Sequence, residues 1–386
     1  MYDPHTHPIL VLQNLVNSLD FFEFFKDFSK LKQKIENLEY LFILNSPLEN
    51  QLEFKQKYKA LINFINSFKL PIILKTKNYH KFFINDYLKK KLRLKLNFLN
   101  ENYFSIIDKF FFNFIKKNYR KYYKIIEDYF LENNITKTID AFTTLEFLEF
   151  YNLINKKIKN KKLEIYYLLD PKIIFKINLK EIKLILKDKY FLGFKFFVDG
   201  TLANKDAMFY QNSSLDFDSK LYLNLNFYKY FLEKLYYILK KKVKINRISF
   251  AYHCIGDKAI DFTLSHLLNK YIIKISELVR VCFRIEHALF IGDKTIQILK
   301  NKLNKYNNVN FYFVFNPNFF FIDINFLKDI KYKNLLNNYF IFRLNEFFEL
   351  LENYGNLGLA FASDCPVTPL NYEFSIFLLK NFLLRK

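Results

Sequence analysis

The 386-residue chain contains no tryptophan, six glycines, two methionines and three cysteines. The cysteines, Cys254, Cys282 and Cys365, lack the paired spacing of a disulfide scaffold, so we expect buried free thiols in a reducing compartment. The first residues lack the basic stretch and apolar core of a signal peptide, and no apolar run approaches the ~20 residues that span a bilayer. These absences predict a cytoplasmic protein that does not enter a membrane.

Aromatic residues and lysine are abundant instead. The chain has 49 Phe and 28 Tyr, and 51% of its residues are hydrophobic, which is enough for a large core. Because Phe, Tyr, Lys, Asn and Ile have A/T-rich codons, this bias fits an A/T-rich genome, such as the reduced genome of a symbiont. The net charge of +22 comes from lysines spread along the whole chain, with no confined basic domain. We therefore expect no nucleic-acid partner.

The second half of the chain alternates apolar runs with amphipathic segments. Five apolar runs each end at a polar residue: "FKFFVDG", "ISFAYHCIGD", "CFRIEH", "VNFYFVFNP" and "LGLAFASDCP". Segments long enough for helices lie between them, such as "DKAIDFTLSHLLNKYI" and "DKTIQILKNKLNKY". Strands alternating with helices indicate a parallel sheet, and polar residues at strand ends are typical of the active-site end of a (β/α)8 barrel. We predict the α/β class and a single TIM-type barrel over residues 1–386.

The first half of the chain has few turn signals. From Gln13 to about Asn133 its periodicity is mostly helical, with strand-like runs at Tyr40–Asn45 and Pro71–Thr76. "TKTIDAF" and "LEIYYLLD" follow as further strand candidates. The segment is longer than the barrel needs, so we predict a helical insertion or lid within about 13–133. Its aromatic residues fit either an apolar substrate pocket or a core, and the sequence does not decide between these.

Residues that can bind a metal ion gather at the predicted strand ends. In the opening "MYDPHTHPIL", His5 and His7 are one residue apart, and on a strand both side chains would point to the same face. The full set is His5, His7, Lys195, His253, His287 and Asp364. Imidazole and carboxylate groups suit zinc or a similar divalent ion. The pattern therefore predicts a metal site at the carboxyl ends of the strands.

Strand alternation also assigns faces to the residues around these ligands. Phe283, Ile285 and His287 are expected to share one face. Arg284 and Glu286 would then point outward to the helices as a structural pair.

Several motifs together resemble the amidohydrolase superfamily, and in particular amidohydrolase family 3, which includes N-substituted formamide deformylases. "DPHTHP" resembles the first-strand metal motif of that family, and "KFFVDGTL" resembles its fourth-strand lysine segment. "HCIGDKAID", "RIEHA" and "SDCPVTPLN" resemble its later histidine and aspartate motifs. "NYHKFFIND" resembles a segment that places His80 and Asn85 near the substrate, with Phe83 where the family usually has Trp.

The resemblance implies a role for each residue. His5, His7 and Asp364 would hold one ion, and His253 and His287 a second if there are two. Lys195 matches a lysine that relatives carboxylate with CO2, a reaction that requires the neutral amine. Asp364 would be catalytic, taking a proton from the attacking water and passing it to the leaving nitrogen. The implied reaction is hydrolysis of a C–N bond in an amide or formamide-like small molecule, with one or two divalent ions, zinc by preference, as cofactor.

Two alternatives stay open. A cyclic-amide hydrolase of the dihydroorotase type belongs to the same superfamily. We expect the barrel to lack the flanking β-sandwich domain of its relatives, which favours a catalytically degenerate barrel acting as a binding or scaffold protein. The sequence also leaves open a homo-oligomer.

Overall fold

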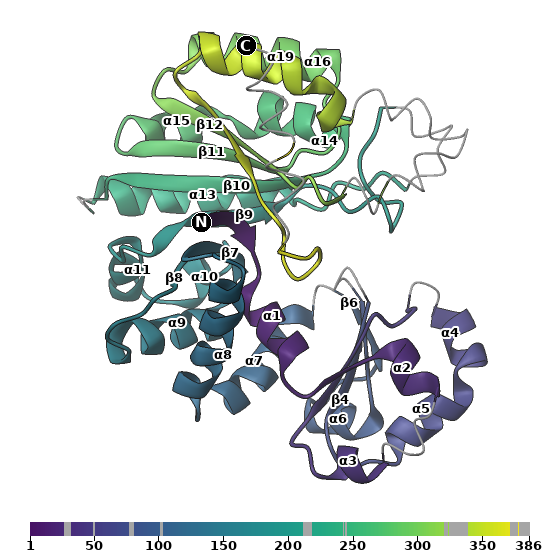
Figure 1. Ribbon diagram of the computed structural model, residues 1–386. Coiled ribbons are helices and arrows are strands. Elements are labelled where there is room, and N and C mark those ends of the chain that lie inside the picture. The colour runs from purple at the N-terminus through teal and green to yellow at the C-terminus, as the bar shows by residue number, and fades with distance from the viewer. Residues whose placement is uncertain are drawn as a thin grey trace.

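The structure is a computed structural model that contains two separate β-sheets (Figure 1). The described residues are 1–26, 32–48, 51–76, 81–100, 103–210, 218–241, 243, 245–319, 323, 339–370 and 377. One sheet has eight strands and the other has five. The large sheet carries the predicted ligands, and the small sheet lies beside it.

The eight-stranded sheet is parallel, and its strands follow one another in chain order. They are β1 (Tyr2–Thr6), β7 (Lys137–Thr143), β8 (Glu164–Leu169), β9 (Phe191–Phe197), β10 (Arg247–Cys254), β11 (Arg280–His287), β12 (Val309–Phe315) and β13 (Leu357–Phe361). A parallel bridge between Thr6 and Cys365, just past β13, joins the first strand to the last. The sheet therefore closes into the predicted (β/α)8 barrel, which is confirmed.

Helices alternate with these strands and lie outside the barrel (Figure 1). They are α9 (Leu145–Lys157), α10 (Ile173–Lys176), α11 (Leu179–Leu186), α13 (Leu225–Lys240), α14 (Asp257–Phe262), α15 (Lys270–Ser276), α16 (Asp293–Lys305) and α19 (Phe340–Asn353). In α16 the buried residues Ile296, Leu299 and Leu303 recur at helical spacing, so one face of the helix packs on the sheet. The segment expected as one helix from Asp257 is divided into α14, a π-helical turn (Thr263–Leu267) and α15.

The two faces of the barrel strands differ in what they contact. On β10, Tyr252 points outward, where its hydroxyl lies 2.6 Å from that of Tyr228 on α13. The preceding residue, Ala251, points to the barrel interior and packs in a small apolar cluster with Ile139 of β7 and Leu168 of β8. Alternation therefore places large aromatic residues against the helices and small or aliphatic ones inside the barrel.

An inserted segment between β1 and β7 contains the second sheet. Its strands are β2 (Ser18–Asp20), β3 (Leu41–Leu44), β4 (Ile72–Lys75), β5 (Lys81–Ile84) and β6 (Phe98–Asn100). The first two pairings are parallel and the last two antiparallel. The helices are α1 (Pro8–Leu15), α2 (Phe21–Lys26), α3 (Lys32–Glu36), α4 (Gln51–Lys57), α5 (Lys59–Asn66), α6 (Asp86–Lys91), α7 (Phe104–Ile115) and α8 (Tyr119–Glu132).

The segment predicted as an insertion therefore contains a sheet beside its helices, and its two strand-like runs correspond to β3 and β4. The sheet has its own apolar core, which includes Phe21, Ile43 and Leu74, separate from the main core around the barrel. The other strands, β2, β5 and β6, are only three or four residues long, too short for their period to stand out in the sequence. In the described part of the chain, every helix is too short or too polar to span a bilayer.

Candidate metal centre

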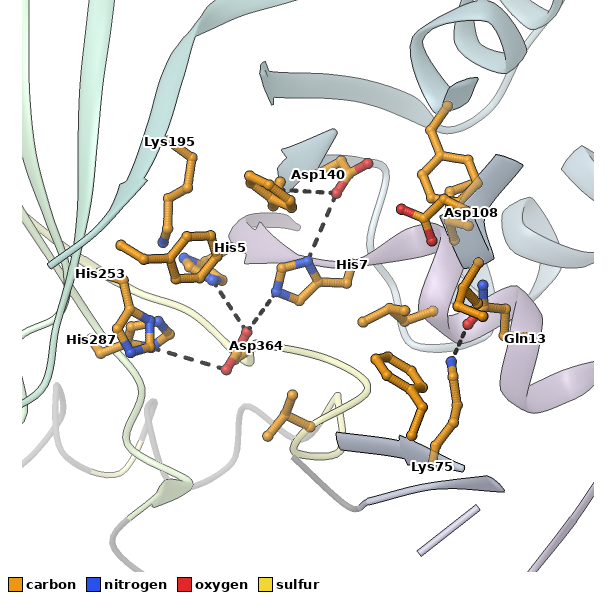
Figure 2. Close-up of a pocket in the computed structure, with 18 residues that line it drawn as sticks. His5, His7, Gln13, Lys75, Asp108, Asp140, Lys195, His253, His287 and Asp364 are labelled. Atoms are coloured by element: carbon orange, nitrogen blue, oxygen red, sulfur yellow. Dashed lines mark hydrogen bonds and ion pairs between the residues drawn. The ribbon is translucent and has the colours of Figure 1, made fainter. Parts of the chain in front are cut away.

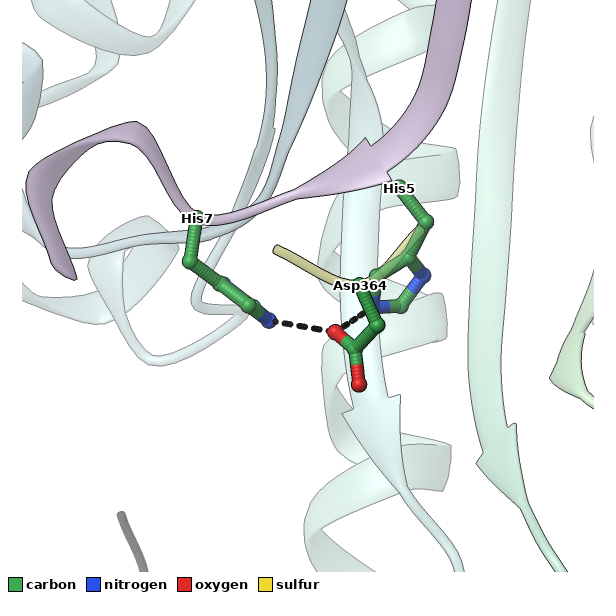
Figure 3. A group of neighbouring side chains, drawn as sticks. All are labelled: His5, His7 and Asp364. Carbon is green, nitrogen blue, oxygen red and sulfur yellow. Dashed lines mark ion pairs between the residues drawn. The ribbon is translucent and has the colours of Figure 1, made fainter. Parts of the chain in front are cut away.

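The carboxyl ends of β1 and β13 meet at a cluster of two imidazoles and one carboxylate (Figure 3). His5 Nε2 and His7 Nε2 each lie 3.2 Å from Asp364 Oδ1. The backbone fixes this arrangement, because the Asp364 N–H donates to the His5 carbonyl at 2.9 Å and the His7 N–H donates to the Cys365 carbonyl at 2.7 Å. The ligand atoms of the three side chains all lie within 4.8 Å of one another.

The chemistry of this cluster fits a divalent cation. Asp364 Oδ1 is buried and accepts no hydrogen bond from the described residues, although two imidazole nitrogens surround it. Burial alone would raise the pKa of Asp364, but the neighbouring His5 and His7 hold that pKa well below its ordinary range. An ionised carboxylate and two imidazoles converging on one point are a donor set suited to zinc.

The other three predicted ligands line the same pocket (Figure 2). The His253 and His287 rings have centroids 4.4 Å apart, and the His5 and His287 centroids are 4.7 Å apart. Lys195 reaches in from β9, is buried, and its Nζ has no hydrogen-bond partner among the described residues. The structure therefore brings together all six predicted metal-site residues.

His287 reaches the pocket in a different way from the one predicted. Phe283 and Ile285 pack in the main core on the helix side, whereas Glu286 faces the barrel interior and contacts His5. The backbone of His287 has a φ of 69°, and Ala288 follows with 46°. This left-handed turn redirects the His287 side chain, so the expected alternation fails at the end of β11. The predicted outward orientation of Arg284 and Glu286 is therefore wrong.

Glu286 and Arg284 support His5 from inside the barrel. His5 Nδ1 lies 2.5 Å from Glu286 Oε2, and Arg284 Nε donates to Glu286 Oε1 at 2.6 Å. Burial opposes ionisation of Glu286, but Arg284 and then His5 hold its pKa well below the ordinary value. The carboxylate therefore accepts the Nδ1 proton of His5, which leaves Nε2 available as a ligand.

His287 is oriented by a neutral partner. Its Nδ1 lies 2.8 Å from Asn316 Oδ1, at the end of β12, and Asn316 in turn donates to the Ala362 carbonyl at 3.2 Å. Burial lowers the pKa of His287 to about 3. A neutral imidazole with Nδ1 occupied can bind a metal through Nε2.

Two carboxylates lie close to His7. His7 Nδ1 lies 3.8 Å from Asp140 Oδ1 on β7, and Asp140 also accepts from the Tyr151 hydroxyl at 2.7 Å. Burial would lower the pKa of His7, but Asp140 and Asp364 raise it to about 9. A site that draws a proton this strongly also attracts a metal cation, which would compete for the same nitrogen.

Lys195 contributes a basic side chain to the candidate metal centre. Burial lowers the pKa of its amine to about 8, although Glu286 and Asp364 partly oppose the effect. Burial therefore shifts the amine toward its neutral form. This is the form that carboxylation would require.

Comparisons with known proteins give a structural similarity alone. No family model matches the chain, and no curated protein matches it. Two solved structures are similar: uncharacterized metal-dependent hydrolases from Pyrococcus horikoshii (TM-score 0.67, 18% identity, covering 98% of this chain and 73% of the hydrolase) and from Pyrococcus furiosus (0.66, 17%, 98% and 75%). The chain has the fold of these hydrolases. At such identities the similarity establishes the fold and not the reaction.

The two residues predicted to bind substrate have different outcomes in the structure. His80 lies outside the described residues. Asn85 is buried, and its Oδ1 accepts from the Leu88 N–H at 3.1 Å and the Ile72 N–H at 3.2 Å. Its Nδ2 donates to two further backbone carbonyls. Asn85 therefore caps α6 and ties the small sheet together, and the residues that line the pocket do not include it.

The pocket also contains residues that sequence reasoning missed. Its apolar lining residues are Ile9, Leu10, Phe82, Ile107, Phe142, Phe147, Phe197 and Val367. Its far end carries Gln13 of α1, Lys75 of β4 and Asp108 of α7. Nothing in the sequence distinguishes Lys75 from the many other lysines, because its burial depends on how the small sheet packs against the barrel.

Proposed function

We propose that this protein is a metal-dependent hydrolase that cleaves a C–N bond in an amide or formamide-like small molecule. The convergence of His5, His7 and Asp364 on one point at the carboxyl end of the barrel carries this proposal. A bound divalent ion would supply Lewis-acid polarisation of the scissile carbonyl and a lowered pKa for water. The shared fold with metal-dependent hydrolases supports the metal-dependent hydrolysis in this proposal and not the choice of bond.

Metal binding and proton transfer are assigned to different residues of the pocket, with Asp364 serving both. His5, His7 and Asp364 would hold one ion, and His253 and His287 would provide ligands for a second ion or for the same one. Asp364 is ionised, buried and placed beside the imidazoles, so it can take a proton from the attacking water. Donating that proton to the leaving nitrogen then completes the cleavage of the amide.

Two finer assignments belong to the proposal. Zinc is the preferred ion, because the donors are imidazole nitrogens and a carboxylate. Lys195 is the candidate for carboxylation, since its amine is buried in the pocket and lacks a hydrogen-bond partner among the described residues. A carbamate there would add an anionic ligand between the two groups of histidines. The choice of a C–N bond rests on the motif resemblance to amidohydrolase family 3.

The deciding experiment is metal analysis by elemental mass spectrometry on protein purified without added metal. We expect one or two transition-metal ions per chain, reduced by Asp364→Asn and His253→Ala. His266→Ala is the matched control, because His266 lies in the π-helical turn away from the pocket. Metal-loaded protein would then be screened with amides and formamides.

One outcome would overturn the proposal. Folded protein that holds no metal after incubation with zinc or manganese is not a metal-dependent hydrolase. Such a result would favour a degenerate barrel that acts as a binding protein.

A further inference from the structure

The pocket has a second polar end, remote from the metal centre. Figure 2 shows Lys75, Gln13 and Asp108 on the side of the pocket opposite His253 and His287. Gln13 and Lys75 are each 1% exposed, and Asp108 is 9% exposed. Three buried polar side chains from three elements therefore lie at this end of the pocket, and the reaction assigned above uses none of them.

The hydrogen bond between Lys75 and Gln13 fixes the orientation of the glutamine amide. Lys75 Nζ donates to the Gln13 oxygen Oε1, which is the arrangement that the ammonium form of Lys75 requires. The amide nitrogen Nε2 then points elsewhere, and among the described residues it finds no acceptor. A buried donor without an acceptor is unfavourable, and a ligand acceptor at this position would relieve that cost.

The surroundings of Lys75 favour an anion as that acceptor. Its Nζ lies 4.8 Å from the Phe42 ring centroid and 5.8 Å from that of Phe82. Burial lowers the pKa of Lys75 to about 7, and burial also raises the pKa of Asp108 well above its usual range. Asp108 is therefore a weak counter-ion at neutral pH. An incoming anion would stabilise the charged ammonium and accept from Gln13 at the same time.

We propose that this end of the pocket binds a carboxylate on the substrate, at the end remote from the scissile amide. One oxygen accepts from Lys75 Nζ and the other from Gln13 Nε2. An apolar chain lies between them, against side chains such as Phe82 and Ile107. The inference rests on the proposed function and narrows its substrate class to amides of ω-amino carboxylic acids.

The test uses ω-formamido carboxylic acids with three to nine methylene groups, together with their uncharged methyl esters. Binding is measured by calorimetry on zinc-loaded protein, and hydrolysis is measured separately. At the chain length that fits, we expect the acid to bind at least tenfold more tightly than its ester. Lys75→Met keeps the apolar stem and should abolish that ratio, while Gln13→Leu should reduce it.

Lys59→Met is the matched control, because Lys59 lies on α5 and does not line this pocket. It should leave the acid-to-ester ratio unchanged. The inference is overturned if no chain length separates acid from ester, or if folded Lys75→Met retains the wild-type ratio.

The two proposals fail separately in this experiment. Hydrolysis of formamides with no dependence on Lys75 would keep the proposed function and remove the carboxylate site. Lys75-dependent binding of acids without any hydrolysis would keep the carboxylate site and remove the proposed function.

Discussion

Glu286 is the residue on which the geometry of His5 depends. It is 0% exposed and links the imidazole to the Arg284 guanidinium, which also donates to the Pro4 carbonyl at 3.0 Å. Buried charges of this kind are stable only as a set, because each ion compensates the desolvation of its neighbour. The carboxylate therefore serves the metal site and the barrel interior together.

Glu286→Gln should weaken both functions. The substitution keeps the shape of the side chain but removes the charge, which leaves Arg284 without an anionic partner and His5 with a weaker acceptor. We expect metal affinity to fall about 10–100-fold and the free energy of unfolding of metal-free protein to fall by about 3–5 kcal/mol. Titration against a competing chelator and urea unfolding measure the two effects.

Glu127→Gln is the matched control for this prediction. Glu127 is also buried, but it accepts from the Tyr123 hydroxyl at 3.0 Å and from the Lys162 N–H at 2.8 Å, far from the ligands. Its substitution should reduce stability and leave metal affinity unchanged. Equal losses of affinity in both variants would show that Glu286 acts only through general stability.

The candidate metal ligands could be found in the sequence, whereas the residues that orient them could not. A polar group that ends an apolar run is visible in the sequence at His253, His287 and Asp364. Asn316 and Asp140 occupy similar positions, but nothing in the sequence says which imidazole each would meet. That information depends on barrel register and on side-chain direction, which appear only when neighbouring strands are in place.

At the level of whole elements, β9 and β10 approach so closely that one position admits only glycine. A Cβ on Gly193 would clash with the backbone carbonyl oxygen and nitrogen of Ser249, which lies opposite it in the strand pairing. Because neither backbone can move without breaking the ladder, the strands would have to separate. The same ladder carries Lys195 and His253 to the pocket.

Gly193→Ala should therefore destabilise the protein by about 1–3 kcal/mol or more, as overpacking does elsewhere. Gly355→Ala serves as control, because an added Cβ there meets nothing within 4 Å. Thermal unfolding of the two variants should differ clearly in midpoint. If Gly193→Ala unfolds at the same temperature as Gly355→Ala, the close approach of β9 and β10 is not what the structure indicates.

The elements themselves were predictable where their patterns were long. The runs expected as strands in the second half became β9 to β13 because each ends in a turn and alternates with an amphipathic helix. The small sheet was only partly recognised, since β3 and β4 matched strand-like runs while β2, β5 and β6 did not stand out. Strand alternation gave the wrong faces for the residues of β11, because the left-handed backbone of His287 breaks the two-residue period.

For the whole molecule, metal binding should be visible as stability. An ion that binds the folded barrel and not the unfolded chain adds about 2.7 kcal/mol when present at 100 times its dissociation constant. We expect zinc to raise the unfolding midpoint and a chelator to lower it. In His5→Ala this difference should vanish, and in His266→Ala it should persist. A midpoint that does not respond to zinc in the wild-type protein would contradict a site of useful affinity.

The seam between β1 and the segment after β13 has a consequence for biosynthesis. There Ser363 Oγ donates to Asp3 Oδ2 at 2.5 Å across 360 positions of sequence, so this is among the contacts of highest contact order in the fold. At roughly 5–20 residues per second, a ribosome needs on the order of 20–70 s to deliver Asp364 after the two histidines. During that interval β1 has an unpaired edge, and Asp364, the third member of the candidate metal cluster, has not yet been made. Metal binding by all three side chains would therefore require that the segment after β13 has docked on β1. A metal-loaded site would then indicate that the barrel is closed.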